Sequence, residues 1–344
     1  MSCYIRGVGA FVPDRVVTNT ELASFLGTTP DWIEENSGIR ERRWVRHNES
    51  ASSLAIEAVR NASRHAGLSA DQIDYLIACT LSPDYQVPGI APFVQRALVG
   101  CRSIPAIDIR TGCAAILYGL QIARGLIESG AARFVVCCGA EAQSKGLDLR
   151  PESREISMLF GDGAGALVLA AEQDEPRSGG LSIRVEDILI ETDGNFAEDL
   201  LVRVPGSANG DHWLSEDQLE RGLHRGSMQG RTVILQAVRK LAESAYRVAE
   251  RNGISLDQIA TFIPHQANGN LLRKLSKKLG VSESRVVMNV DRLGNTSGAS
   301  AFLAMEQAVR EQRIEADSYS MILAFGAGFT WGAALCRCYG RSRV

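Results

Sequence analysis

Two stretches of this sequence follow the same pattern, and this internal repeat constrains the fold more than any other feature. GLSADQIDYLIACT begins at Gly67, and GISLDQIATFIPHQ begins at Gly253, 186 residues later. The same offset carries residues 111–115, TGCAA, onto residues 297–301, SGASA, and apolar residues at helical spacing follow both. RFVVCCG and YSMILAFG then match at an offset of 187 residues. Three matches in the same order predict an internal duplication.

Each half of the chain is predicted to contain the series strand–helix–strand–helix–strand–strand. Strands that are apolar throughout and alternate with helices indicate sheets covered on both faces. Two such halves side by side predict an α/β fold of five layers, α/β/α/β/α, with pseudo-twofold symmetry. We place the halves at residues 1–175 and 176–344. The glycine-rich run FGDGAGA (160–166) lacks a nucleotide-binding spacing, so we interpret it as close strand packing.

Composition excludes several classes of function. The net charge of −3 gives no reason to expect nucleic acid or an anionic membrane as a partner. No apolar run is long enough to span a bilayer, and the first residues do not have the pattern of a signal peptide. The eight cysteines include no CxxC pair, so we interpret them as reduced thiols, neither disulfides nor zinc ligands. We therefore expect a cytoplasmic protein without a metal site.

Cys113 lies on a predicted strand-to-helix corner, between the apolar run SIPAIDI and an amphipathic helix. Such a corner presents the sulfur at the end of a sheet, where the first turn and dipole of the helix favour a thiolate. This arrangement suits a nucleophile. The local alternative is that Cys113 is a small buried apolar residue, as most free cysteines are.

Polar residues also end two strands of the second half. The motif HQAN, from His265 to Asn268, follows IATFI, and the motif GNTS, which contains Asn295, follows VVMNV. Open α/β sheets bind ligands at the carboxyl ends of their strands. Taken singly, Asn268 and Asn295 are helix N-caps by preference. The duplication, however, places Cys113, His265 and Asn295 on equivalent strand ends around one axis.

Two further segments have both a structural and a functional interpretation. The glycine-rich FGAGFTWG (325–332) is either a tight hairpin or a source of a free Gly328 N–H for an oxyanion, beside the Cys113 N–H. Residues 171–229 fall outside the repeat, apart from a strand-like run at LSIRVEDILIETDG. They form either a surface insertion or a wall of the active-site entrance.

Cysteine, histidine and asparagine in this order also occur in papain-like proteases, but the sequence around Cys113 is not CGSCW-like. The motifs TGCAA, HQAN, GNTS, FGDGAGA and FGxGxTWG, in this order, instead resemble those of β-ketoacyl-acyl-carrier-protein synthase III, one of the thiolase-like condensing enzymes. The resemblance runs from Gly7 to about Cys336. It implies the duplicated five-layer thiolase-like fold and a homodimer.

The resemblance implies a Claisen condensation in two stages. Cys113 takes an acyl group from acyl-CoA or another acyl thioester. His265 and Asn295 then donate hydrogen bonds to a malonyl thioester on an acyl carrier protein, so that loss of carbon dioxide leaves a stabilised enolate. The enolate attacks the acyl-cysteine, whose oxyanion is held by the N–H groups of Cys113 and Gly328. No metal or redox cofactor is implied.

The family's CoA-binding pattern is matched at Trp32 and Arg154, an aromatic face and a guanidinium suited to adenine and phosphates, and its pantetheine contact at Asn268. Val87 stands where a housekeeping member has a bulky phenylalanine that reaches into the partner's acyl pocket. The smaller side chain implies a longer or wider acyl group.

Other departures concern the carrier protein. Gly269 and Asn270 follow HQAN where a family member has Leu-Arg, and Leu235 replaces a lysine. The candidates for docking an acidic carrier are therefore Arg273, Lys274, Lys277 and Lys278, unless they are ordinary solvated charges. We expect a specialised, polyketide-like pathway. The alternatives are housekeeping initiation of fatty acid synthesis, an acyltransferase to an oxygen or nitrogen, and a degenerate partner subunit, which would have lost Cys113.

Overall fold

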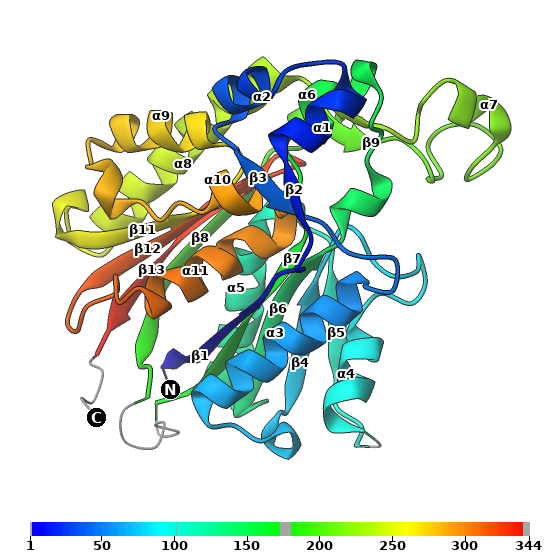
Figure 1. Cartoon of the computed structure of the whole chain (residues 1–344). Helices are drawn as coiled ribbons and strands as arrows, with labels where there is room; N and C mark the ends of the chain where they lie inside the picture. Colours follow the sequence, from blue (N-terminus) through cyan, green and yellow to red (C-terminus); the bar gives the residue numbers. More distant parts are fainter. Residues whose placement is uncertain (1, 101, 173–179, 340–344) are drawn as a thin grey trace.

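A computed structural model describes residues 2–100, 102–172 and 180–339 (Figure 1). The main elements of the first half are β1 (Cys3–Phe11), α3 (Ala51–Ala66), β4 (Tyr75–Cys79), α4 (Ala91–Val99), β5 (Ala106–Ile109), α5 (Ala115–Glu128), β6 (Phe134–Glu141) and β7 (Gly163–Ala171). Those of the second half are β8 (Ile183–Thr192), α8 (Gly230–Arg251), β11 (Ile259–Pro264), α9 (Gly269–Leu279), α11 (Ser300–Arg310), β12 (Tyr319–Gly326) and β13 (Thr330–Cys338).

Shorter helices and strands lie between these main elements along the chain. They are β2 (Val16–Thr18), α1 (Asn19–Leu26), α2 (Pro30–Ser37), β3 (Glu41–Arg43), α6 (Arg154–Ser157), β9 (Leu200–Val202), α7 (Glu216–Glu220), β10 (Gly226–Met228) and α10 (Val290–Leu293). Two single turns of 3-10 helix matter for the site, η2 (Gly112–Ala114) and η8 (Ser297–Ala299). No helix in the described ranges combines the length and the apolar character needed to cross a bilayer.

The main strands form one hydrogen-bonded sheet whose order is symmetric about the β1–β8 pair, apart from the edge strand β5, whose counterpart beside β11 is an isolated bridge between Phe262 and Val286. The order is β5–β4–β6–β7–β1–β8–β13–β12–β11. At the centre β1 and β8 meet antiparallel, with Tyr4 opposite Arg184 and Ile5 opposite Ile183. Going outward on either side, the next two pairings are antiparallel and the following one is parallel. The two halves therefore share one topology.

Three separate apolar cores show how the layers stack. Helices α3 and α4 cover the outer face of the first half-sheet, and α8 covers the outer face of the second, with α9 packed on α8. Helices α5 and α11 lie between the half-sheets, because each contacts strands of both (Figure 1). Along β6, Cys137 belongs to the central core and Cys138 to an outer core, as the two-residue period of a strand requires. The predicted five-layer fold is confirmed.

Gly9 allows the helix α3 to lie close to the strand β1. A Cβ on Gly9 of β1 would lie 2.2 Å from the backbone nitrogen of Ala62 on α3. No side chain fits at that separation, so the glycine sets the distance between helix and strand.

The repeat has a one-residue irregularity that the sequence comparison missed. In the structure η2 and η8 are equivalent, so Gly112 corresponds to Ser297, at an offset of 185 residues rather than 186. Both residues have positive φ, 58° and 45°. The β6–β12 match also has an offset of 185 rather than 187, because Cys138 pairs with Ala78 as Leu323 pairs with Pro264. Short strand motifs fix the presence of a repeat but not its register.

The charged stretch after α2 contains the short strand β3 and one buried cation. Arg42 of β3 is completely buried. Its guanidinium donates to Asn19 Oδ1 at 2.7 Å and to Met158 O at 2.8 Å. Burial lowers the pKa of Arg42 to about 10. A buried guanidinium is tolerated here because carbonyl and amide oxygens replace its water.

The segment between the halves is only partly irregular. LSIRVEDILIETDG contains β8, the first strand of the second half, as predicted. The following residues form the β9–β10 pair and α7, which stands out from the body at the right of Figure 1. The boundary placed between residues 175 and 176 lies outside the described residues.

Candidate active site

Cys113 lies where β5 gives way to α5, on the corner formed by η2. The positive φ of Gly112 makes the sharp turn that this corner needs. Cys113 is partly exposed, whereas the six other described cysteines are buried. Of the described thiols, only that of Cys113 is therefore open to a substrate.

The equivalent corner of the second half lies against the first. The Cys113 Sγ is 3.7 Å from the Ser297 Oγ, and η2 contacts η8. The β12–β13 hairpin closes a third side, since a Cβ on Gly326 would lie 3.0 Å from the Cys113 nitrogen. The structure thus brings together two corners that are far apart in the sequence, as the duplication predicted. The expected strand VVMNV (286–290) is, however, reduced to an isolated bridge between Val286 and Phe262, and α10 leads into the second corner.

Asn295 is held so that its amide group has one orientation. Its Oδ1 accepts a hydrogen bond from the Ser297 N–H at 2.8 Å. Its backbone is fixed by Leu159 O and the Gly161 N–H, at 2.7 and 3.1 Å. The interpretation of Asn295 as a helix N-cap is therefore wrong: it closes a two-residue turn ahead of η8. No described residue accepts a hydrogen bond from its Nδ2, which can donate to a ligand.

His265 directly follows β11 and is buried. Its Nδ1 is hydrogen-bonded to the Ser300 hydroxyl, which also accepts from the Gln266 N–H at 3.1 Å. In the described part of the chain, the Ser300 proton has no other acceptor than Nδ1. When the Ser300 hydroxyl donates to Nδ1, the ring proton is on Nε2. Burial lowers the pKa of His265 to about 3, so the ring is neutral and Nε2 is a hydrogen-bond donor.

The thiol of Cys113 is less acidic than the sequence suggested. Burial raises its pKa to about 12, and the Glu141 carboxylate also raises it, while a hydrogen bond with Ser297 lowers it. This burial opposes the preference of a helix N-terminus for a thiolate, on which the sequence-based expectation rested.

Gly328 occupies the turn of the β12–β13 hairpin, with a φ of 131°. Its neighbour Phe329 is anchored on both sides, by N–H to O hydrogen bonds of 2.9 Å to and from Asp193. Among the described residues, none accepts from the Gly328 N–H. The role of this group in an oxyanion hole stays a prediction.

Trp32 and Arg154 come together from α2 and α6. The guanidinium carbon of Arg154 lies 5.2 Å from the centre of the Trp32 ring. Arg154 is exposed, and Trp32 is partly exposed. Beside them Ser153, Ile156 and Arg225 line a cavity of about 380 Å³. The insertion after β8 therefore forms one wall of this cavity.

Asn268 is a helix N-cap, as its local sequence predicted. Its Oδ1 accepts from the N–H groups of Asn270 and Leu271, at 2.8 and 3.2 Å, and its Nδ2 donates to Asn36 O at 3.1 Å. These bonds join α9 to α2. Its predicted pantetheine contact is not tested by this geometry.

The remaining predicted residues lie on the surface. Val87 is 83% exposed on the single chain. The cations of α9 share its exposed side: Arg273, Lys274, Lys277 and Lys278. No described cluster of three or more His, Cys, Asp or Glu side chains could hold a metal ion.

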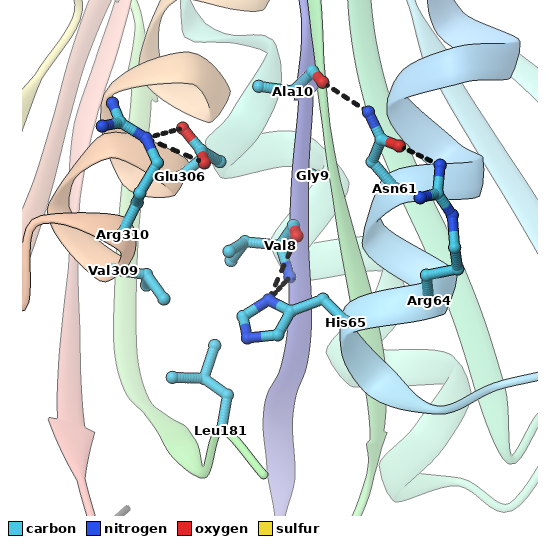
Figure 2. Close-up of a pocket in the computed structure, with 10 residues that line it drawn as sticks. All are labelled: Val8, Gly9, Ala10, Asn61, Arg64, His65, Leu181, Glu306, Val309 and Arg310. Carbon is cyan, nitrogen blue, oxygen red and sulfur yellow. Dashed lines mark hydrogen bonds and ion pairs between the residues drawn. The ribbon is translucent and has the colours of Figure 1, made fainter.

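A cavity of about 530 Å³ lies elsewhere, between α3 and α11 beside β1 (Figure 2). His65 and Arg64 line it from α3, and Glu306 and Arg310 from α11. It contains none of the predicted site residues.

Sequence reasoning missed two polar residues at the site. Glu141 ends the apolar strand β6 and is completely buried beside Ser297, and Ser300 orients His265. The position of Glu141 at the carboxyl end of a strand could have indicated it.

Comparison with known proteins agrees with this geometry. Residues 107–187 match the family described as 3-oxoacyl-[acyl-carrier-protein (ACP)] synthase III, and residues 249–338 match its C-terminal region. The chain is 39% identical over 333 residues to the β-ketoacyl-[acyl-carrier-protein] synthase III of Roseiflexus castenholzii, covering 97% of each chain. It is 40% identical over 334 residues to that of Erythrobacter litoralis, covering 97% of this chain and 98% of the relative.

Solved structures give the same result. The crystal structure of 3-oxoacyl-(acyl carrier protein) synthase III from Pseudomonas aeruginosa superposes with a TM-score of 0.86 at 28% identity, covering 100% of both chains. The priming β-ketosynthase from the R1128 polyketide biosynthetic pathway superposes with a TM-score of 0.85 at 28% identity, covering 99% of this chain and 97% of that one.

Proposed function

The chain belongs to the 3-oxoacyl-[acyl-carrier-protein] synthase III family, and on that premise we propose that it catalyses a decarboxylative Claisen condensation at the Cys113 corner. The observation that carries the proposal is the contact between two corners. Cys113, the one described cysteine that is not buried, lies against the corner that contains Asn295, whose Nδ2 is a free hydrogen-bond donor in the described structure. His265 follows strand β11, and its Nε2–H is a hydrogen-bond donor.

In the first half-reaction, the Cys113 sulfur attacks the carbonyl carbon of an acyl thioester, and the CoA thiolate leaves. In the second, a malonyl thioester on a carrier protein places its thioester oxygen near Asn295 Nδ2 and His265 Nε2. These donors stabilise the enolate that forms as carbon dioxide leaves. The enolate carbon attacks the acyl-cysteine, and the Cys113 and Gly328 N–H groups hold the oxyanion. A neutral His265 suits this work as a donor.

We further propose that the reaction needs no metal or redox cofactor and takes place in the cytoplasm. The thioesters of the two substrates supply the reactive carbonyl groups, and side chains and backbone N–H groups supply the rest. The seven described cysteines are free thiols, which agrees with a reducing compartment.

Incubation with a panel of acyl-CoAs of increasing length, followed by intact-protein mass spectrometry, tests the proposed function. We expect a single acyl adduct, localised to Cys113 by peptide mapping. Release of carbon dioxide and of the β-ketoacyl carrier protein on adding malonyl-carrier protein completes the test. An enzyme that accepts the acyl group but passes it to an alcohol or amine, without decarboxylation, would contradict the proposal.

The curated relatives carry the name β-ketoacyl-[acyl-carrier-protein] synthase III, and one similar structure is a polyketide priming enzyme. The relatives' names favour initiation of fatty acid synthesis, the alternative we noted from the sequence. We propose this initiating role, with a starter longer or wider than acetyl. The exposed Val87 is the residue on which the wider starter depends.

Val87→Phe is expected to narrow the choice of starter. In a homodimer, which we also propose, this exposed side chain would enter the partner's acyl pocket, and the larger ring would fill it. We predict that acylation by long or branched acyl-CoAs falls by about 10- to 200-fold relative to acetyl-CoA, the range for a changed apolar pocket. The panel above measures this ratio. Val87→Leu is the control for bulk, with a smaller effect. A monomer by light scattering, or an unchanged ratio, would contradict the pocket.

Charge reversal on α9 is expected to weaken the carrier-protein reaction. Lys274 and Lys278 lie one turn apart on its exposed side, where an acidic partner can be steered to the site. For Lys274→Glu/Lys278→Glu we predict that KM for malonyl-carrier protein rises by about tenfold, while acylation by acyl-CoA is unchanged. Arg60→Glu, on the exposed side of α3, is the matched control. An equal effect of the control would identify these charges as ordinary surface groups.

A further inference from the structure

A buried carboxylate lies at the Cys113 corner, and no Lys or Arg in the described ranges forms an ion pair with it. Glu141 is completely buried at the end of β6. Its oxygens accept from the Leu81 and Gly298 N–H groups, at 3.2 and 3.1 Å, and from the Ser82 hydroxyl at 2.6 Å. Gln143 Nε2 donates to it at 3.1 Å. These donors stabilise the ionised form inside the protein, where an isolated carboxylate would be neutral.

The hydroxyl of Ser297 connects this carboxylate to the nucleophile. Ser297 Oγ is 3.7 Å from the Cys113 Sγ, and the Ser297 hydroxyl also opposes the rise that burial causes in the pKa of Glu141, whose carboxylate accepts from the adjacent Gly298 N–H at 3.1 Å. Ser297 holds this place through two backbone contacts, its own N–H to Asn295 Oδ1 and that of Gly298 to Glu141. Thiol, hydroxyl and carboxylate therefore form a chain of three groups.

The protonation states of the groups at the corner indicate why the Cys113 thiol needs a proton acceptor. Burial raises the pKa of the Cys113 thiol to about 12, so attack on a thioester requires an acceptor for its proton. His265 does not serve, because its Nδ1 is bonded to Ser300 and its Nε2 carries the proton. Burial also raises the pKa of Glu141, and the thiols of Cys113 and Cys79 are the titratable groups that interact with it.

We propose that Glu141 accepts the Cys113 proton through Ser297 when the sulfur attacks an electrophile. The proposal deepens the condensing function proposed above and rests on it. The Cys113 proton moves to Ser297 Oγ, and the Ser297 proton moves to a Glu141 oxygen. The sulfur bonds to the acyl carbon, and the bond from that carbon to the CoA sulfur breaks. The CoA thiolate takes a proton from water after it leaves.

The relay runs backward in the second half-reaction. Attack of the enolate on the acyl-cysteine breaks its carbon–sulfur bond and leaves a Cys113 thiolate. Glu141 returns its proton through Ser297, which restores both groups. The pair carries one negative charge before acylation and again after enolate attack, and none in the acyl-enzyme, where Glu141 is protonated and Cys113 is a neutral thioester. The relay therefore avoids a thiolate and a carboxylate buried together, an arrangement that the mutual repulsion of two like charges disfavours.

Alkylation of Cys113 by iodoacetamide tests the relay without any substrate, so its outcome is separate from that of the acyl-CoA test. Glu141→Gln keeps the size of the side chain and removes the acceptor. Ser297→Gly removes the hydroxyl and suits the positive φ, which the equivalent Gly112 also has. For both variants we predict an alkylation rate at neutral pH about a hundredfold lower, the usual contribution of a general base. Peptide mass spectrometry measures modification at Cys113.

The pH dependence separates a relay from a structural role. The wild-type rate is expected to be nearly constant across neutral pH, and the rate of both variants to rise with hydroxide. Malonyl-thioester decarboxylation, which uses His265 and Asn295, is expected to persist in both. A faster Glu141→Gln enzyme would overturn the proposal, because removing a neighbouring negative charge alone lowers the thiol pKa. An unchanged pH profile would also overturn it, even with a slower rate.

Discussion

Cys113→Ala is expected to abolish acyl-enzyme formation with every acyl-CoA tested. The sulfur forms the covalent bond, and no other described cysteine is even partly exposed. Alanine differs from cysteine by the sulfur alone, so the pocket and the N–H groups of η2 stay in place. The measurement is intact-protein mass spectrometry after incubation with acyl-CoA, where the adduct mass disappears. The fold is expected to persist, because the side chain is not part of an apolar core.

The matched control is Cys138→Ala, which removes a buried sulfur from an outer core and leaves the corner intact. This variant is expected to keep its adduct, and to lose some stability, as core truncations do. A full adduct on Cys113→Ala would mean that another residue carries the acyl group. The proposed function would then have to be rebuilt around that residue.

The layers and the corners could be predicted from the sequence because both depend on local patterns. Apolar strands that alternate with helices predict covered sheets, and a repeat predicts that the sheets are equivalent. Cys113 and His265 were correctly placed on strand ends by this argument, but Asn295 was not: VVMNV (286–290) forms only an isolated bridge from Val286 to Phe262, and the short helix α10 precedes Asn295. The register also failed: the repeat gave Ser297 as the equivalent of Thr111, and the structure gives Gly112. The positive φ of Ser297 is invisible in a sequence where serine has no such preference.

Buried polar residues were another failure. The polarity pattern around Arg42, Glu141 and Ser300 predicts the environment of the neighbouring residues, but it does not predict that these three polar residues are buried. Their partners come from distant parts of the chain: Arg42 bonds Met158 O, and Glu141 bonds the Gly298 N–H. Such contacts exist only after distant segments of the chain have packed together, so no local period reports them. Two of these residues, Glu141 and Ser300, lie at the candidate site.

Asn295→Ala is expected to separate the two half-reactions. The variant should form the acyl-Cys113 adduct, because neither the sulfur nor the N–H groups of η2 are altered. Decarboxylation of malonyl thioester should fall by about 10²- to 10³-fold, the usual cost of losing one oxyanion donor. Release of carbon dioxide from malonyl-carrier protein, measured beside the adduct mass on the same sample, checks both halves. A variant that decarboxylates at the wild-type rate would contradict the role of the Nδ2 group.

Asn295→Asp shows which atom matters. Alanine removes the Nδ2 donor and also leaves the Ser297 N–H without the Oδ1 that it now reaches at 2.8 Å, a loss of about 1 to 3 kcal/mol for a buried donor. Aspartate keeps an oxygen for Ser297 and removes only the donor, but places a negative charge beside the developing enolate. Decarboxylation should therefore fall at least as far in Asn295→Asp as in Asn295→Ala. If Asn295→Asp instead recovered the activity, the residue would act by holding Ser297, and the enolate would depend on His265 alone.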